Sequence, residues 1–166
     1  MPRLQWAFAV DRLDHATQRD QIGDVFCDFA VGRFDAIVVF LVRDGNALGW
    51  HGRVAGGKPL TPIDQISLPL GPASAFQIAH DGMRVYHGPV PTPVHPTENR
   101  LWEALGTPPP LDLVVAPILV KQRVVNLAYA HGTGGSPLPD TDAAELAELA
   151  VRASDAYVRL IKKSRQ

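Results

Sequence analysis

The sequence is short of the features that mark several common classes of protein. Its 166 residues include a single cysteine, Cys27, so no disulfide can form within the chain, which suits a reducing cytosol. Sixteen Lys and Arg residues balance seventeen Asp and Glu residues, without the basic surplus that accompanies nucleic-acid binding. No apolar run reaches the roughly 20 residues that cross a bilayer. We therefore expect a cytoplasmic protein with no membrane insertion and no nucleic-acid partner.

The longest mostly apolar stretch runs from Leu111 to Gly132 and is broken only by Lys121, Gln122 and Arg123. β-Branched and aliphatic residues on both sides of a short charged break are typical of a hairpin. Each half is too apolar for a surface ribbon, so at least one face should lie in the core. We expect these two strands to form the centre of the sheet.

A second hairpin is predicted earlier in the chain. Residues 34–42 are rich in β-branched side chains, and residues 47–54 can return as the partner strand. Asp44 and Gly45 lie between them, and Asp-Gly is a strong signal for a tight turn.

Glycine and proline mark irregular positions in the remaining extended segments. Gly49 and Gly52 interrupt one strand, which predicts a bend or the close approach of another segment. Pro69, within the extended residues 66–70, indicates an edge strand or a bulge. Residues 89–96 contain four prolines and should form a stiff loop.

Apolar residues at intervals of three and four predict helices near the start of the chain. The first covers residues 4–15, with Leu4, Phe8 and Leu13 on one side. The second follows Asp20, a plausible N-terminal cap.

Three more helices are predicted in the rest of the chain. One begins after the cap Ser74 and stops at Gly82, and another covers residues 98–106. In the last helix, Asp142 and Glu145 have the spacing of a capping box. Its apolar stripe consists of Leu146, Leu149, Ala150, Ala153, Tyr157, Leu160 and Ile161.

The order of these elements predicts the fold class. Helices lie at both ends, strands come mostly in consecutive pairs, and no alternating strand-helix-strand pattern is present. This order favours an α+β fold with an antiparallel sheet.

Four stretches resemble the GAF domain family. RDQIGDVFCDFAVGRFDAIVVFLVRDG (19–45) is similar to the leading helix, first strand and turn of the family, and ISLPLGPASAFQIAHDGMRVYHG (66–88) to its strand, short helix and next strand. VVAPILVKQRVVNLAYA (114–130) resembles the final hairpin with its proline, and DAAELAELAVRASDAYVRL (142–160) the closing helix. The likeness extends to GAF-like regulatory modules of multidomain bacterial signalling proteins.

The resemblance implies one GAF-like domain over residues 1–166, with its core at about 16–162 and a leading helical segment at 1–15. It implies a profilin-like antiparallel sheet of five to six strands. The N- and C-terminal helices would cover one face of this sheet, and a ligand pocket would lie on the other. It also implies a non-enzymatic regulatory or sensory module for signal transduction.

Departures from the family pattern argue against several of the ligands and reactions found in the family. The Asn-Lys-Phe-Asp-Glu signature of cyclic-nucleotide-binding members is absent, and Asn126 stands where a glycine is common. Bilin-binding relatives attach their chromophore through a cysteine, but Cys27 falls on the leading helix, away from the expected pocket. One cysteine is also too few for the methionine sulfoxide reductases of the family.

Six side chains come from the elements that surround the pocket in the resembled fold. Aromatic rings with polar edges suit a small planar ligand, although the same rings can simply fill the volume. The candidates are Trp50, His51, Phe76, Tyr86, His87 and Trp102. Two functions therefore stay open: a small-molecule sensor whose proline-rich loop tightens over its ligand, and a ligand-free dimerisation or protein-interaction scaffold with a self-filled pocket.

No group of residues forms a recognisable catalytic or metal site. The histidines show no close ligand spacing, and no second cysteine is present to support zinc. His80 and His87 could approach each other if the short helix folds over its strand. We expect no catalytic residues, no metal and no cofactor.

The terminal helices could bring two proteins together. Such helices mediate pairing in the resembled family, and small residues on the last helix leave room for another helix. The candidate interface residues are Trp6, Phe8, Ala150, Ala153 and Tyr157. The expected partner is a second copy of the chain or another signalling protein.

Overall fold

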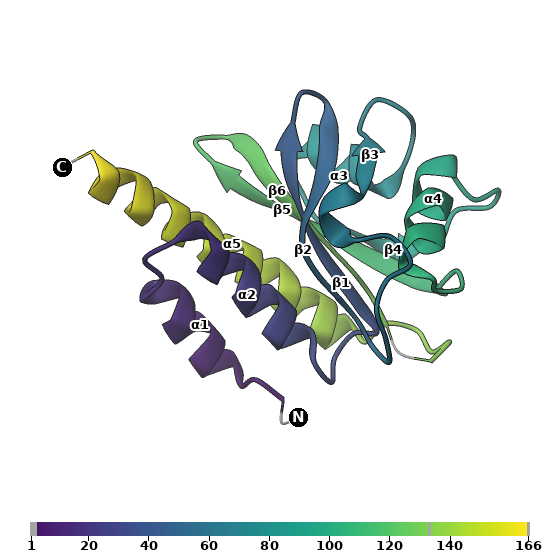
Figure 1. The fold of residues 1–166 in the computed structure, drawn as a ribbon, viewed down its shortest axis with the longest axis horizontal. Helices are drawn as coiled ribbons and strands as arrows, with labels where there is room; N and C mark the ends of the chain where they lie inside the picture. Colours follow the sequence, from purple (N-terminus) through teal and green to yellow (C-terminus); the bar gives the residue numbers. More distant parts are fainter. Residues whose placement is uncertain (1–2, 133, 166) are drawn as a thin grey trace.

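The structure, a computed structural model that describes residues 3–132 and 134–165, has a six-stranded antiparallel sheet with helices on both faces (Figure 1). The strand order is β3-β2-β1-β6-β5-β4. These features confirm the predicted α+β class and the five to six strands. In chain order the elements are α1 (Trp6–Asp14), α2 (Arg19–Ala30), β1 (Ala36–Arg43), β2 (Asn46–Val54), the 3-10 helix η1 (Ile63–Gln65), β3 (Ser67–Pro69), α3 (Ala75–Gly82), β4 (Tyr86–Pro89), α4 (Pro96–Leu105), β5 (Asp112–Val120), β6 (Arg123–His131) and α5 (Asp140–Ser164).

Side chains of the central strands alternate between two hydrophobic cores, because successive residues of a strand point to opposite faces. Phe40 and Tyr129 belong to the core on the side of α3 and α4. Their neighbours Val39 and Ala130 belong to the core under α1, α2 and α5. The N- and C-terminal helices therefore share one face of the sheet, as predicted.

Both predicted hairpins are present, and each closes with a two-residue turn. Asp44 and Gly45 have φ values of 53° and 76°, and Lys121 and Gln122 have φ values of 52° and 62°. Left-handed backbone at both positions is the turn that matches the twist of paired strands, and Asp-Gly favours it. Lys-Gln lacks a glycine, and the left-handed conformation costs an L-residue about 1–2 kcal/mol.

Glycine and proline mark irregular places in β2 and β3, as predicted. A Cβ atom at Gly49 would lie 1.9 Å from the carbonyl oxygen of Ile63, so η1 packs directly on the backbone of β2. The register with β1 shifts beside this glycine and leaves Trp50 as an extra, unpaired residue. Pro69 lies in β3, the edge strand.

The start of α2 differs from the prediction. The cap is Gln18, and Asp20 lies within the first turn. The side-chain oxygen of Gln21 accepts the backbone N–H groups of Thr17 and Gln18, so the capping box uses two glutamines. Asp20 is free for a contact with β2.

Two other helix ends also differ from the prediction. Helix α3 retains Gly82, and the left-handed residue that ends it is Met83, with φ of 50°. Helix α5 begins after Pro139, so Asp142 is not its cap. Asp142 instead lies 3.4 Å from the guanidinium of Arg3 and helps to hold the N-terminal segment against α5.

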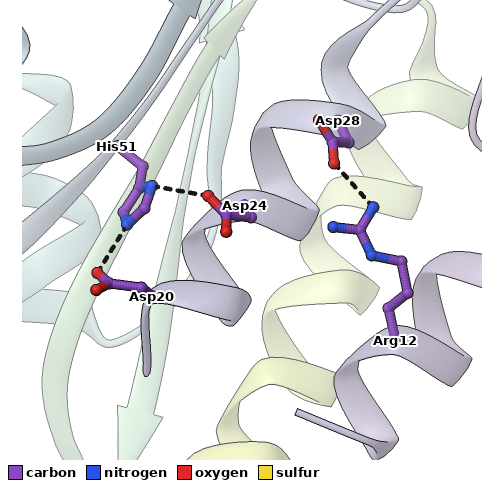
Figure 2. Close-up of polar contacts among 5 residues, drawn as sticks. All are labelled: Arg12, Asp20, Asp24, Asp28 and His51. Atoms are coloured by element: carbon purple, nitrogen blue, oxygen red, sulfur yellow. Dashed lines mark hydrogen bonds and ion pairs between the residues drawn. The ribbon is translucent and has the colours of Figure 1, made fainter. Parts of the chain in front are cut away.

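Helix α2 lies close to β2 where His51 reaches across to it. The imidazole Nε2 lies 3.2 Å from Asp20, and Nδ1 lies 3.5 Å from Asp24, one turn further along α2 (Figure 2). Gly23 makes room for the ring, because a Cβ atom there would lie 2.3 Å from the imidazole carbon Cδ2.

Helix α1 is held against the other terminal helices by two arginines. Arg12 forms an ion pair of 2.8 Å with Asp28 of α2 (Figure 2). Arg159 of α5 donates to the backbone carbonyl groups of Leu13 and Ala16 at 2.8 Å and 3.1 Å, so it ties α5 to the C-terminal end of α1 and the residues just after it.

The prediction of one domain over residues 1–166 includes residues 1, 2, 133 and 166, which lie outside the described part of the chain, and it stays a prediction. Within the described part, no helix combines the length and the apolar character needed to cross a membrane.

The place of His51 over Gly23 predicts an unusual response to Gly23→Ala. Alanine in a helix is ordinarily favoured over glycine by about 1 kcal/mol. Here the added methyl group should displace His51 and lower the free energy of unfolding by about 1 kcal/mol. Urea unfolding measures the effect.

Two comparisons control this experiment. In a His51→Ala background, the same Gly23→Ala change should become stabilising, because the ring is gone. Gly71→Ala should have little effect, because a Cβ atom there meets no other atom within 4 Å. Stabilisation by Gly23→Ala in both backgrounds would contradict the assigned contact.

Candidate functional site

The sheet separates the six predicted pocket residues. Phe76, Tyr86 and Trp102 belong to the core on the side of α3 and α4, whereas Trp50 packs against the core of the terminal helices. His51 also faces α2. The extra residue in β2 explains this placement, because a bulge lets two successive side chains leave the strand on the same side.

His87 does not join the other candidates either. It follows Tyr86 in β4, so its side chain leaves the opposite face of the strand, and Nε2 lies 3.6 Å from Asp112. His80, its suggested neighbour, pairs with Asp81 at 2.9 Å. The six residues therefore do not border one pocket.

Four aromatic rings fill the space between the sheet and helices α3 and α4. We call Phe40, Phe76, Trp102 and Tyr129 the aromatic cluster; none of them is more than 1% exposed. The rings of Phe76 and Tyr129 are stacked with centroids 5.6 Å apart, and Phe40 meets Phe76 edge-on at 5.4 Å. Close packing of this kind leaves little room for a ligand.

A chain of hydrogen bonds satisfies the polar atoms of the aromatic cluster. Trp102 Nε1 donates to the Tyr129 hydroxyl at 2.8 Å, and this hydroxyl donates to Nδ1 of His131 at 2.7 Å. Burial lowers the pKa of His131 to about 4, so the imidazole is neutral. Because the Tyr129 hydroxyl already accepts the Trp102 N–H, its own proton is directed at Nδ1, which accepts in the matching tautomer. Burial also raises the pKa of Tyr129 far above its usual value, so its hydroxyl keeps its proton.

A buried carboxylate joins α4 to α3 above the aromatic cluster. Glu98, in the first turn of α4, is fully buried and accepts the backbone N–H of Ala75. His95 Nδ1 lies 3.2 Å from the other carboxylate oxygen. Ser74 accepts the backbone N–H of Gln77 and caps α3, as predicted. Of these contacts, the one between Glu98 and Ala75 joins α4 to α3.

Three of the predicted interface residues belong to the interior. Ala150, Ala153 and Tyr157 are at most 6% exposed, because they face the core between α5 and the sheet. Their prediction as interface residues is wrong, since packing within the chain already covers this apolar stripe.

The other two predicted interface residues differ from each other. Trp6 is half-buried and meets Phe29 of α2 edge-on, with centroids 6.0 Å apart. Phe8 is 64% exposed, so it does not lie with Leu13 on the inner side of α1 as predicted. Val151, on α5, is the other large apolar residue exposed on the terminal helices.

The surroundings of Cys27 suppress ionisation of its thiol. Burial raises the pKa of the Cys27 thiol to about 12, so the thiolate that would act as a nucleophile is scarce at neutral pH. Within residues 3–132 and 134–165, no three His, Cys, Asp or Glu side chains gather in a way that could hold a metal ion.

The structure also contains an open groove that sequence reasoning missed. It has a volume of about 460 Å³, and its lining residues come from the two hairpin turns, from β2 and from the C-terminal end of α5. Trp50 and Tyr157 place it on the helix side of the sheet. We call it the basic groove. The basic residues that line the groove are Arg19, Arg43, Lys121, Arg123 and Arg165. The sequence signal that could have found it is the concentration of basic residues at the two hairpin turns.

No protein-family model matches the chain, and comparison with curated proteins finds no match either. Solved structures do match. The phycocyanobilin-bound GAF domain of a cyanobacterial phytochrome is 14% identical, with a TM-score of 0.75, and the match covers 99% of this chain and 100% of that chain. The GAF domain of a phosphoenolpyruvate-protein phosphotransferase from Coxiella burnetii is 12% identical, with a TM-score of 0.71 and coverage of 97% and 95%.

An enzyme has a similar fold as well. The free methionine-R-sulfoxide reductase from Neisseria meningitidis, solved with its substrate, is 15% identical, with a TM-score of 0.71 and coverage of 95% of this chain and 89% of that chain. Matches at this level of identity identify a fold, and one fold can serve different functions. The chain has the fold of GAF domains, as the sequence resemblance predicted.

Proposed function

We propose that this protein is a non-enzymatic regulatory module that acts through contacts with other proteins. The observation that carries the proposal is the closure of the aromatic cluster. Phe76 and Trp102 are at most 1% exposed, and they occupy the side of the sheet where the resemblance predicted a ligand pocket. Of the two functions left open by the sequence, the scaffold with a self-filled pocket is therefore favoured.

The state of the titratable groups supports a non-enzymatic role. Cys27 keeps its proton because burial raises its pKa to about 12. His131 is neutral and already accepts the Tyr129 hydroxyl, so Nδ1 has no free lone pair for a substrate. Neither group has the exposed, activated character of a nucleophile or a general base.

The outer surfaces of the terminal helices offer a place for protein contacts. Phe8 on α1 and Val151 on α5 expose 64% and 54% of their surfaces. Large apolar side chains of this kind lose contact with water when a second chain covers them. We assign the homodimer contact to these outward residues, in place of the buried Ala150, Ala153 and Tyr157.

A sensor that holds its ligand beside Trp50, Phe76 and Tyr86 is less well supported. Trp50 lies on the opposite face of the sheet from the other two residues. The proline-rich loop at residues 89–96 cannot close over all three at once.

A cavity experiment tests whether the aromatic cluster is a core. Trp102→Ala should lower the free energy of unfolding by about 3–5 kcal/mol, because it leaves a buried cavity and unpaired polar atoms. Added indole should recover part of this loss, as measured by thermal unfolding. Trp102→Leu leaves a smaller cavity and serves if the alanine variant does not fold.

Wild type and Trp50→Ala are the matched controls for the cavity experiment. Indole should raise the melting temperature of neither protein, because the cluster is full in both. An equal rise in wild type, with NMR shifts of the Phe76 and Tyr129 ring signals, would mean that the cluster opens to a ligand, and the self-filled pocket would be rejected.

The neutral state of His131 predicts a loss of stability in acid. The unfolded chain protonates this histidine near pH 6.5, whereas the folded chain resists protonation down to about pH 4. Protons therefore favour the unfolded chain as the pH falls through this window, by about 3 kcal/mol at its lower end.

Replacement by asparagine tests this linkage. His131→Asn keeps an acceptor for the Tyr129 hydroxyl but cannot be protonated in this range. In urea unfolding between pH 6.5 and pH 4, its stability should fall less steeply than that of wild type. The exposed His15→Asn should keep the wild-type slope, and equal slopes for all three proteins would contradict the buried neutral state.

The proposed dimer is tested by sedimentation velocity. Wild type should associate, and Phe8→Glu should weaken the association at least about tenfold, because it places a charge in an apolar contact. Leu60→Glu is the control, since Leu60 is 78% exposed in the loop between β2 and η1. A monomeric wild type, or equal association of the Phe8 variant, would reject this interface.

A further inference from the structure

The basic groove lies between the sheet and the ends of helices α2 and α5. Its walls come from both hairpin turns, the first residue of α2 and the last turns of α5. Its volume of about 460 Å³ falls in the range of small-molecule sites, roughly 300–1,000 Å³.

The groove has an apolar lining with two aromatic side chains. Trp50 enters it because the bulge turns this residue toward the helices, and Tyr157 faces it from α5. Leu41, Val125 and Ile161 add aliphatic surface. A flat apolar group would be removed from water between these side chains.

The charges around the groove all have one sign. No acidic residue lines it, and within the described part of the chain Arg19, Arg43, Lys121 and Arg123 form no ion pair. Asp20, the acid next to Arg19, lies 3.2 Å from His51. Several cations around one concave surface attract an anion and raise its local concentration.

A buried polar atom in the groove also lacks a partner. Asn126 is only 1% exposed; its Nδ2 donates to the carbonyl oxygen of Phe40 at 3.0 Å. Its Oδ1 has no hydrogen-bond partner among the described residues. Asn126 lines the groove, and its side chain also lies within hydrogen-bonding reach of Tyr157 on the same surface. Buried acceptors are normally paired, so this atom suits a donor brought by a ligand.

The turn that carries part of the charge is held in an unfavourable conformation. Lys121 and Gln122 both have positive φ values without a glycine, whereas the β1–β2 turn uses Asp-Gly for the same geometry. Strained residues of this kind are enriched at binding sites. The backbone strain at Lys121 and Gln122 therefore supports a binding site, but less strongly than the charges and the unpaired acceptor do.

From these observations we infer that the basic groove binds a small aromatic carboxylate that carries a hydrogen-bond donor. The cations would hold its carboxylate, Trp50 and Tyr157 would contact its ring, and Asn126 Oδ1 would accept its donor. The site goes beyond the proposed function, because it gives the module an effector site on the helix side of the sheet, away from the aromatic cluster.

The first test uses 2-naphthoate as the probe and maps its binding by NMR. The backbone amides of residues 120–126 and the Trp50 indole N–H should shift and reach saturation. The double variant Lys121→Gln, Arg123→Gln should bind about tenfold more weakly. Arg43→Gln, changed alone, should also weaken binding, and it provides a second variant if the double variant does not fold.

The matched control removes one lysine and one arginine elsewhere. Lys58 and Arg100 are exposed and line no part of the groove, so Lys58→Gln with Arg100→Gln should bind 2-naphthoate as wild type does. The neutral 2-naphthalenemethanol should bind at least about tenfold more weakly than 2-naphthoate.

Three results would overturn the inference. Equal binding of 2-naphthoate to wild type and to the Lys121 and Arg123 double variant would remove the role of the cations. Inorganic phosphate that matched the affinity of 2-naphthoate would indicate general attraction of anions. Groove residues that responded to vesicles of phosphatidylglycerol but not to 2-naphthoate would indicate a membrane surface as the partner.

The role of Asn126 has its own test. Hydroxynaphthoates are compared with the methoxynaphthoates of the same substitution pattern, which have no donor. The isomer that places its hydroxyl against Oδ1 should bind up to about tenfold more tightly than its methoxy partner. If no hydroxyl isomer gained over its methoxy partner, the assigned contact with Asn126 would be wrong.

Discussion

The hydrogen bond between Trp102 and Tyr129 is the contact on which the closed side of the sheet depends. It joins α4 to β6, one of the two middle strands, across a fully buried core. Without it the indole N–H would be buried without a partner, and the Tyr129 hydroxyl would keep only His131, so the indole, the phenol and His131 have to assemble together. The contact of Glu98 with Ala75 then carries α3 along with α4. A ligand could enter the core on the side of α3 and α4 only if this connected network of hydrogen bonds were broken.

The parts of the fold that sequence reasoning predicted are those with local causes. The β-branched segments, the Asp44-Gly45 turn and the Ser74 cap each depend on residues near one another in the chain. Composition also predicted that at least one face of β5 and β6 lies in the core, and the structure buries both faces.

The site was harder to predict because its geometry depends on pairing between distant segments. Nothing within β2 reveals that Trp50 is unpaired; the shift exists only relative to Val39 and Phe40 of β1. An apolar stripe on a helix fits a sheet or a partner equally well, so Ala153 could not be assigned from its spacing. The basic groove draws its charges from turns and helix ends far apart in the chain, and only the folded structure brings them together.

The extra residue in β2 has a consequence for any comparison with other chains of this fold. In a strand, successive side chains point to opposite faces of the sheet. One inserted residue therefore shifts the numbering by one, and each later residue of the strand lies on the face opposite to the one that its number would otherwise predict. A related chain without the insertion, matched to this one without a gap at Trp50, would have its side chains assigned to the wrong layer. At identities of 12–15%, sequence similarity alone would not reveal such an offset.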